Sequence, residues 1–254
     1  MQEHSTGVLK SPEFPNIIGL IAELNGNSSF GKFLHSWESV IYALLVIALL
    51  SWAALHVSKN RKMIPSGLQN AAEYLVSFID DFVCSVLGAK GRQYTPFIGT
   101  LFIYIFALNS IGLVPFLKSP TIELSATFAL ALVVFFYTIY IALRELGPLG
   151  FIDHLMGQPR GIMAMTLIMP VFMFFIEVIS LLVRPISLSL RLRSNIYGDD
   201  TILALFASQG INGFLWLFPN FLLVIMTSVI QAAVFSILTL VYFSMVMKHD
   251  PEHH

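Results

Sequence analysis

The segment RPISLSLRLRSN, residues 184–195, places the charged residue Arg191 in a stretch that is otherwise apolar enough to lie in a bilayer. A guanidinium keeps its positive charge at any accessible pH. On insertion scales, a charge of this kind costs about 2.5–3.5 kcal/mol at the centre of a membrane helix. A charged residue with such a cost is rarely found in a membrane helix unless its charge acts on another group. The segment therefore predicts an ion pathway within a membrane protein.

The composition of the whole chain also indicates a membrane protein. Of its 254 residues, 56% are hydrophobic and 11% are charged, whereas a soluble domain has about 25% charged residues. The formal net charge of -1 gives no basic surface for nucleic acid. Cys84 is the one cysteine, so no internal disulfide can form, and no zinc-ligand spacing is present. We therefore expect an all-α polytopic membrane protein with no metal, no cofactor and no nucleic-acid partner.

A membrane-spanning helix needs about 20 mostly apolar residues, and five segments meet this requirement. They lie at about residues 37–57, 95–116, 121–143, 161–208 and 214–247. Residues 66–89 are amphipathic, which predicts an interfacial or membrane-dipping helix, and residues 144–160 are interpreted as a polar loop. The fourth segment would be roughly 70 Å long as one helix. It must therefore tilt strongly, bend or break, with Pro185 the natural bend, and the last span is also expected to be long and tilted.

Lysine and arginine residues in the loops set the predicted orientation. With five spans the two chain ends lie on opposite sides, and these residues divide eight to three between the sides. Because the cytoplasmic side carries the excess of positive charge, we expect the N-terminus outside and the C-terminus in the cytoplasm. A bacterial plasma membrane is favoured over an organellar one. The predicted division is an outer segment at 1–36, a single membrane domain at 37–247 and a cytoplasmic tail at 248–254.

Polar residues of the fourth segment fall on one face of the predicted helix. A helix turns about 100° per residue, so Glu177, Arg184 and Arg191, spaced seven apart, lie close to one line. Ser187 and Asn195 are four residues from Arg191 on either side and share this face. The rest of the circumference is mostly Leu, Ile, Val and Phe, so the polar face should meet protein or water and not lipid.

Two further polar groups complete the candidate ion path. Asp200 follows Arg191 by nine residues and should point to the opposite side of a straight helix. That separation leaves the Asp200 carboxylate free to exchange protons and the Arg191 cation free to meet an acidic neighbour. Gln231, on the last span, lies beside small residues that permit close helix approach. It can hydrogen-bond the guanidinium or orient water next to it.

Three motifs, taken together, resemble subunit a of F-type ATP synthases. The first is RPISLSLRL at 184–192, followed by Asn195, Ile196 and Tyr197. The second is PTIELSAT at 120–127, before the third span, and the third is QAAVFSILTLVY at 231–242. The motifs occur in the family's order, and the similarity covers about residues 37–247 with the same number of spans.

This resemblance implies a non-catalytic stator subunit that lies beside a ring of c subunits, each with a mid-membrane carboxylate. Two offset aqueous half-channels would meet the ring on either side of Arg191, with Asn195 and Gln231 as its polar surroundings. Asp200 would be the carboxylate of the outer half-channel, and Glu177 the acidic residue near the inner one. The implied partners are the c ring, b-type peripheral stalk subunits, the lipid bilayer and protons, with Na⁺ the less favoured ion.

The chain departs from the family pattern in three places. Arg193 and Ser194 stand where an aromatic residue and a glycine are usual, and this second cation can face the interface or pair with Asp199. Asp199 itself replaces a residue that is usually small. Val224 stands where many members carry His or Glu, so the outer relay must do without that group. Asp199 beside Asp200 can compensate for the loss.

Two other functions fit parts of the pattern. A stand-alone secondary transporter or channel could use the same charged residues for a proton or an anion, but such folds often show internal repeats and none is visible. An intramembrane hydrolase would need a nucleophile paired with a base, and no clear pair lies within the spans. We interpret Asn109 as a packing or rim residue, and Asp80 with Asp81 as a solvated face.

Overall fold

The computed structural model describes residues 36–59, 67–114, 117–156, 165–208 and 211–247. Over these residues the chain is helical and contains no β-strand, which confirms the predicted all-α class. The α-helices are α3 (Glu38–Lys59), α4 (Leu68–Leu87), α5 (Thr95–Ser110), α6 (Leu124–Leu155), α7 (Met165–Ser208) and α8 (Ile211–Met247). Three short 3-10 helices lie between them: η1 (Ala89–Tyr94), η2 (Ile111–Leu113) and η3 (Pro120–Ile122).

Five helical segments in the described chain are long and apolar enough to cross a membrane. They are Glu38–Lys59, Ala89–Leu113, Leu124–Phe151, Pro170–Leu203 and Phe218–Met247. α4 is a separate helix at the position of the predicted amphipathic segment. The prediction of five spans and one further helix is confirmed, and the chain is a multi-pass membrane protein.

The polar loop predicted at 144–160 is wrong over residues 144–155, because α6 continues to Leu155. The helix is kinked at Gly147, which has a positive φ of 70°, and Pro148 follows directly. Glycine tolerates a positive φ, and proline fits the first turn of the helix that follows. The Gly-Pro pair therefore makes a kink between two helical segments of α6 and not a polar loop. Residues 157–160 of the predicted loop lie outside the described residues.

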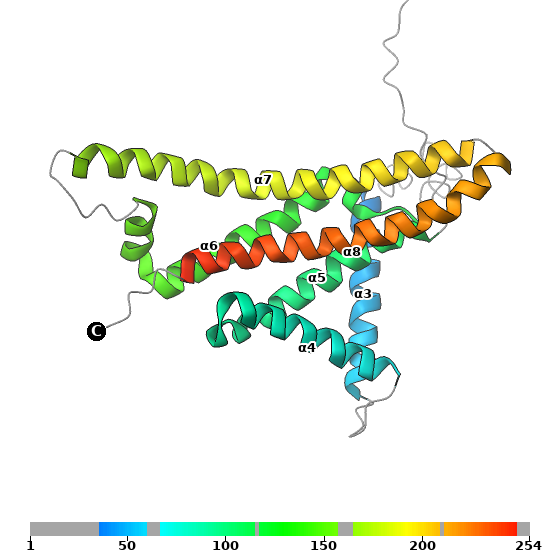
Figure 1. Cartoon of the computed structure of the whole chain (residues 1–254), viewed down its shortest axis with the longest axis horizontal. Helices are drawn as coiled ribbons and strands as arrows, with labels where there is room; N and C mark the ends of the chain where they lie inside the picture. Colours follow the sequence, from blue (N-terminus) through cyan, green and yellow to red (C-terminus); the bar gives the residue numbers. More distant parts are fainter. Residues whose placement is uncertain (1–35, 60–66, 115–116, 157–164, 209–210, 248–254) are drawn as a thin grey trace, which may run out of the picture.

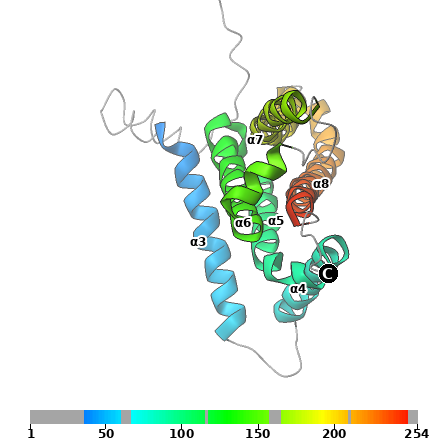
Figure 2. The ribbon, with the colours of Figure 1, turned by 90° about the vertical axis from the view of Figure 1, so that its left-hand side faces the viewer.

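α7 is one helix of 44 residues and does not break at Pro185. A proline inside a helix removes one backbone hydrogen bond, but packing against α6 and α8 holds the neighbouring turns in place. α7 runs steeply across the direction of α3, and α8 lies alongside α7 (Figures 1 and 2). The length of α7 is therefore accommodated by tilt, as predicted. α8 begins at Ile211, slightly before the predicted span.

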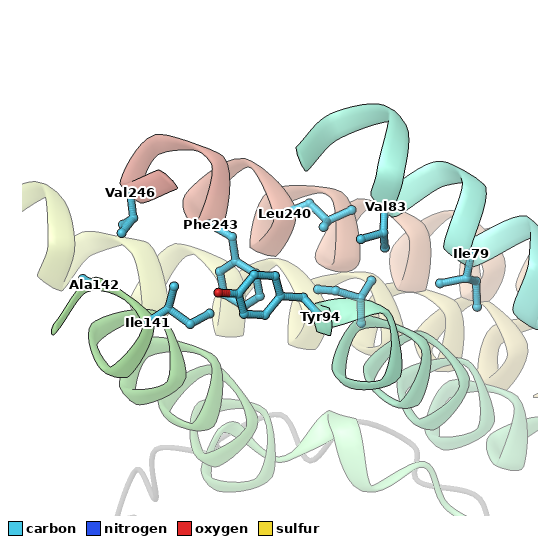
Figure 3. Close-up of a cluster of buried hydrophobic side chains, with 9 residues drawn as sticks. Ile79, Val83, Tyr94, Ile141, Ala142, Leu240, Phe243 and Val246 are labelled. Atoms are coloured by element: carbon cyan, nitrogen blue, oxygen red, sulfur yellow. The ribbon is translucent and has the colours of Figure 1, made fainter. Parts of the chain in front are cut away.

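A cluster of buried side chains joins five helical elements, α4, η1, α5, α6 and α8 (Figure 3). Val83 of α4, Ile141 of α6 and Phe243 of α8 are each 1% exposed or less. The ring of Phe243 lies 5.5 Å from that of Tyr94, at the end of η1. This packing fixes α8 against α4, α5 and α6, and the polar region described below lies along α7 and the part of α8 that faces it.

Asp80 and Asp81 lie where a solvated face was predicted; Asp81 is exposed, and the Asp80 side chain is 17% exposed and paired with Arg92. The Asp80 carboxylate accepts hydrogen bonds from Arg92 at 2.7 and 2.9 Å and from the Thr95 hydroxyl at 2.7 Å. These bonds tie α4 to the start of α5. The hydrogen bond from Arg92, and then that from Thr95, lowers the pKa of Asp80 below its ordinary value. The sequence could not reveal this pairing because the residues are 12 to 15 positions apart in a turn.

Asp80→Asn is expected to lower the melting temperature of the purified protein at neutral pH. A carboxyl group whose pKa is depressed in the folded state stabilises that state above its unfolded pKa of about 3.9. The stabilisation is lost as the pH falls through the lower folded pKa, so the two proteins should converge in that acidic range. Asp81→Asn is the matched control, since Asp81 is the exposed neighbour. Equal melting temperatures of Asp80→Asn and the parent at pH 7 would contradict the assignment.

Candidate functional site

The buried face of α7 determines which of its side chains point outward. Leu188, Leu192 and Ile196 are at most 3% exposed, and their spacing of four residues places them on one helix face. Leu188 and Leu192 pack in a cluster with side chains of α5, α6 and α8. Arg191 and Arg193 lie off this buried face and are exposed.

Arg191 is exposed on the outer face of α7. Ser187 and Asn195, four residues before and after Arg191, share this face and are also exposed. The exposed apolar residues Ile186 (47%) and Leu190 (46%) lie beside it. No hydrogen bond or ion pair to the Arg191 guanidinium is made by the described residues. A charge on a membrane helix without a partner among the described residues is costly. The arrangement therefore favours an acidic partner from another molecule.

Asn195 and Gln231 join α7 to α8 beside this face. The Nδ2 group of Asn195 donates a hydrogen bond of 2.6 Å to Oε1 of Gln231. Gln231 is only 3% exposed. Of the two alternatives for Gln231, a direct bond to the Arg191 guanidinium is not made by the described residues, and the amide oxygen of Gln231 is held by Asn195. This contact fixes the position of the helix pair beside Arg191.

Glu177 and Arg184 form an ion pair on the same helix. Nη2 of Arg184 donates to Oε1 of Glu177 at 3.1 Å, which confirms that residues seven apart on α7 share a face. The guanidinium of Arg184 also lies 4.8 Å from the ring centroid of Tyr242 on α8, within the range of a cation–π contact. Ser187 is exposed, and its hydroxyl donates to the Arg184 carbonyl at 3.1 Å. Arg184 therefore links Glu177 to α8.

Arg193 and Asp199 do not pair with each other, contrary to one of the predicted alternatives. Nε of Arg193 donates to the carbonyl of Ile122 in η3 at 3.1 Å. Oδ2 of Asp199 accepts a hydrogen bond of 2.8 Å from the Thr227 hydroxyl on α8. The two residues are six positions apart and on different sides of α7. Arg193 thus anchors α7 to the segment before α6, and Asp199 anchors it to α8.

Asp199 and Asp200 line a cavity of about 50 Å³ between α5, η2, α7 and α8. Asn109, Ser119 and Asn220 contribute its other polar side chains. The apolar part of the lining comprises Gly112, Leu113, Ile196, Leu203, Phe221 and Val224. Because Arg191 is exposed on the outer face while Asp200 lies in this internal cavity, the predicted separation of the two charges is observed.

Sequence reasoning missed part of this cavity. Thr227 and Asn220 were not recognised as candidates, and Asn109 was assigned to packing or to a rim. A signal was available, because polar side chains within membrane spans are rare and often functional. Asn109 interrupts the apolar run of α5, and Asn220 follows Pro219 in the apolar start of α8. Their common location could not be deduced from the sequence, since α5 and α8 are far apart along the chain.

These features define a class of protein before any comparison is made. Long apolar helices, a cation on an outer face and carboxylates in an internal cavity are typical of polytopic helical proteins that move ions across membranes.

Within that class, the chain belongs to the ATP synthase A chain family, whose sequence model matches residues 39–244. It is 38% identical over 250 residues to ATP synthase subunit a of Protochlamydia amoebophila (strain UWE25), across 95% of this chain and 92% of the relative. It is 39% identical over 207 residues to ATP synthase subunit a 3 of Pelobacter propionicus, across 82% and 86% of the two chains. The subunit a of Solidesulfovibrio magneticus is 39% identical over 213 residues, with 84% and 85% covered. The resemblance inferred from the three motifs is confirmed.

Proposed function

We propose that this chain is the proton-translocating stator subunit of a rotary F-type ATP synthase. It would form two aqueous half-channels beside the c ring and couple proton flow to rotation of the ring. The observation that carries the proposal is Arg191, an exposed guanidinium within the apolar span of α7 that has no partner among the described residues. Membership of the ATP synthase A chain family supports the same function.

The role of Arg191 follows from electrostatics. Two unit charges 4 Å apart interact by about 4 kcal/mol at an effective dielectric constant of 20, so a c-subunit carboxylate that reaches Arg191 would be held in its ionised form. A proton cannot occupy a carboxylate while it is paired in this way, which blocks direct passage between the half-channels. A carboxylate must therefore take up a proton on one side and release it on the other after travelling around the ring.

The two polar regions of α7 supply the half-channels in this proposal. Asp200 and Asp199, in the cavity between α5, α7 and α8, would receive protons from the outer side. Glu177, paired with Arg184, would lie near the inner exit. With Val224 apolar, Asp199 would take the place of the His or Glu that many family members carry on the last span. Asn195 and Gln231 would hold the helix pair in register beside Arg191.

The proposal also covers the partners of the chain and its location in the cell. The chain would contact c-ring subunits through the outer face of α7 and b-type peripheral stalk subunits elsewhere, and it would not itself be catalytic. We place it in a bacterial plasma membrane with the N-terminus outside and the C-terminus in the cytoplasm, since basic loop residues favour the cytoplasmic side. Residues 37–247 would form the single membrane domain, between an outer segment at 1–36 and a cytoplasmic tail at 248–254.

Proton conduction is expected to require c subunits. Vesicles containing this chain with c and b subunits should acidify or alkalise when a potassium diffusion potential is applied, whereas vesicles containing the chain alone should not. The physical reason is that neither polar region of α7 crosses the membrane by itself. The measurement is the fluorescence of a pH dye in matched vesicles. Conduction by the chain without c subunits would favour a stand-alone transporter and overturn the proposal.

A further inference from the structure

Two buried amide groups lie in the cavity that contains Asp199 and Asp200. Asn109 of α5 is 1% exposed and Asn220 of α8 is 3% exposed. Within the described chain, the Nδ2 atom of neither residue has a hydrogen-bond acceptor. Leaving a buried donor unsatisfied costs about 1–3 kcal/mol, and most buried polar groups in proteins are satisfied by protein or by ordered water. Two such donors in one cavity indicate a common acceptor.

The orientation of Asn109 is fixed by hydrogen bonds on its other side. The Thr121 hydroxyl donates to Oδ1 of Asn109 at 3.0 Å and lies 2.7 Å from the Ser119 hydroxyl. Ser119 in turn donates to the Leu108 carbonyl at 2.8 Å. Because this buried network holds the amide oxygen, the NH₂ group is left as the part of Asn109 available to the cavity. A polar network with one free donor is a defined binding position for an acceptor.

Water is the acceptor that fits this cavity. One water molecule needs about 10–15 Å³ of such volume and two to four polar partners, and the cavity offers about 50 Å³. A water oxygen can accept from an asparagine NH₂ group while its hydrogens point towards a carboxylate. The carboxylates of Asp199 and Asp200 line the same cavity. The amide NH₂ groups can therefore donate hydrogen bonds to the oxygen of such a water, and the carboxylates can accept hydrogen bonds from its hydrogens.

Asn220 stands one helical turn before Val224 on α8. Residues four apart on a helix share a face, and both line the cavity. Val224 can neither donate nor accept a hydrogen bond. The polar contribution of α8 to this cavity therefore comes from Asn220, while Thr227 on the next turn is occupied by Asp199.

We propose that Asn220, together with Asn109, holds ordered water against the Asp199 and Asp200 carboxylates, and that this water is part of the outer proton path. Asn220 is a positioning residue, since it acts through water and does not itself carry the proton. This inference rests on the proposed function, but it assigns a role to residues that the function alone does not require.

Proton flux through reconstituted vesicles containing the chain with c and b subunits tests the role of Asn220. Asn220→Leu keeps the side-chain size but removes the amide, and we expect it to lower flux about tenfold, the equivalent of losing one hydrogen bond in the path. Asn220→Ser retains a polar group and leaves space for another water, so it should keep most of the flux. Co-purification with c subunits must be normal in both variants. Unchanged flux in Asn220→Leu, or equal loss in Asn220→Ser, would overturn the proposal.

Hydration of the cavity is tested separately from activity. In a Cys84→Ser background, the thiol of Asn220→Cys should react with a small water-soluble thiol reagent, because the reactive thiolate forms only where water reaches it. Ala232→Cys is the matched control, since Ala232 is 0% exposed on the same helix and does not line the cavity. An unreactive thiol at 220 would show a dry cavity and end the inference. Should Arg191→Ala still abolish pumping in that case, the proposed function would stand without it.

Discussion

Replacing Arg191 by alanine is expected to abolish ATP-driven proton pumping while leaving the complex assembled. The guanidinium makes no hydrogen bond or ion pair with the described residues of its own chain, and it lies on an exposed face of α7. Its removal should therefore cost the fold little, in contrast to loss of a buried residue such as Leu192, which is 0% exposed. What is lost is the fixed charge that a rotor carboxylate must meet. The measurement is quenching of a pH-sensitive dye in membrane vesicles supplied with ATP.

Two comparison variants make this result specific to position 191. Arg193→Ala removes a cation two residues away that donates to the Ile122 carbonyl, so we expect it to weaken the anchoring of α7 and to retain part of the pumping. Arg191→Lys keeps the charge but replaces the planar, forked guanidinium by a compact ammonium group, and activity should stay well below that of the parent. Pumping that survives Arg191→Ala, with c subunits present in normal amount, would exclude the proposed mechanism.

Asp200→Asn is expected to slow passive proton flow by about a hundredfold, the lower end of what a positioned acid or base contributes. Asparagine has the same shape as aspartate but cannot take up and release a proton at accessible pH. Asp200 lies in the internal cavity and away from Arg191, so the change should leave the pairing of Arg191 with the rotor intact. Flow is measured in vesicles stripped of the catalytic sector under a potassium diffusion potential.

The Asp199→Asn variant tests the role of Asp199 in proton flow separately from that of Asp200. Asp199 accepts a hydrogen bond from Thr227, and an asparagine oxygen can accept the same bond. If Asp199 compensates for the apolar Val224, this variant should also lose flow, and the double variant should be no faster than Asp200→Asn alone. Near-normal flow in Asp200→Asn would remove that carboxylate from the path, whatever the result at position 199.

The local and periodic features of the chain were sufficient to predict its fold class and the alignment of its charges. Long apolar runs determine spans because every backbone group in lipid must be hydrogen-bonded within a helix. The spacing of seven residues placed Glu177 and Arg184 together, and the structure shows them paired at 3.1 Å. The same periodicity separated Asp200 from Arg191. The error at residues 144–155 arose because a Gly-Pro pair can either end a helix or redirect it, and local chemistry alone does not decide between these outcomes.

The contacts between helices could not be predicted from the local and periodic features of the sequence. Asn195 bonds to Gln231, Asp199 to Thr227 and Arg193 to Ile122, across separations of 36, 28 and 71 residues. Each choice depends on which faces of α7, α8 and η3 meet, and many pairings satisfy the same hydrophobic pattern. The sequence by itself determined a chain of membrane helices with a permanent cation on α7. Only the tertiary structure decided that this cation has no partner among the described residues, and that two amides and two carboxylates line one cavity, because packing brings α5, α7 and α8 together.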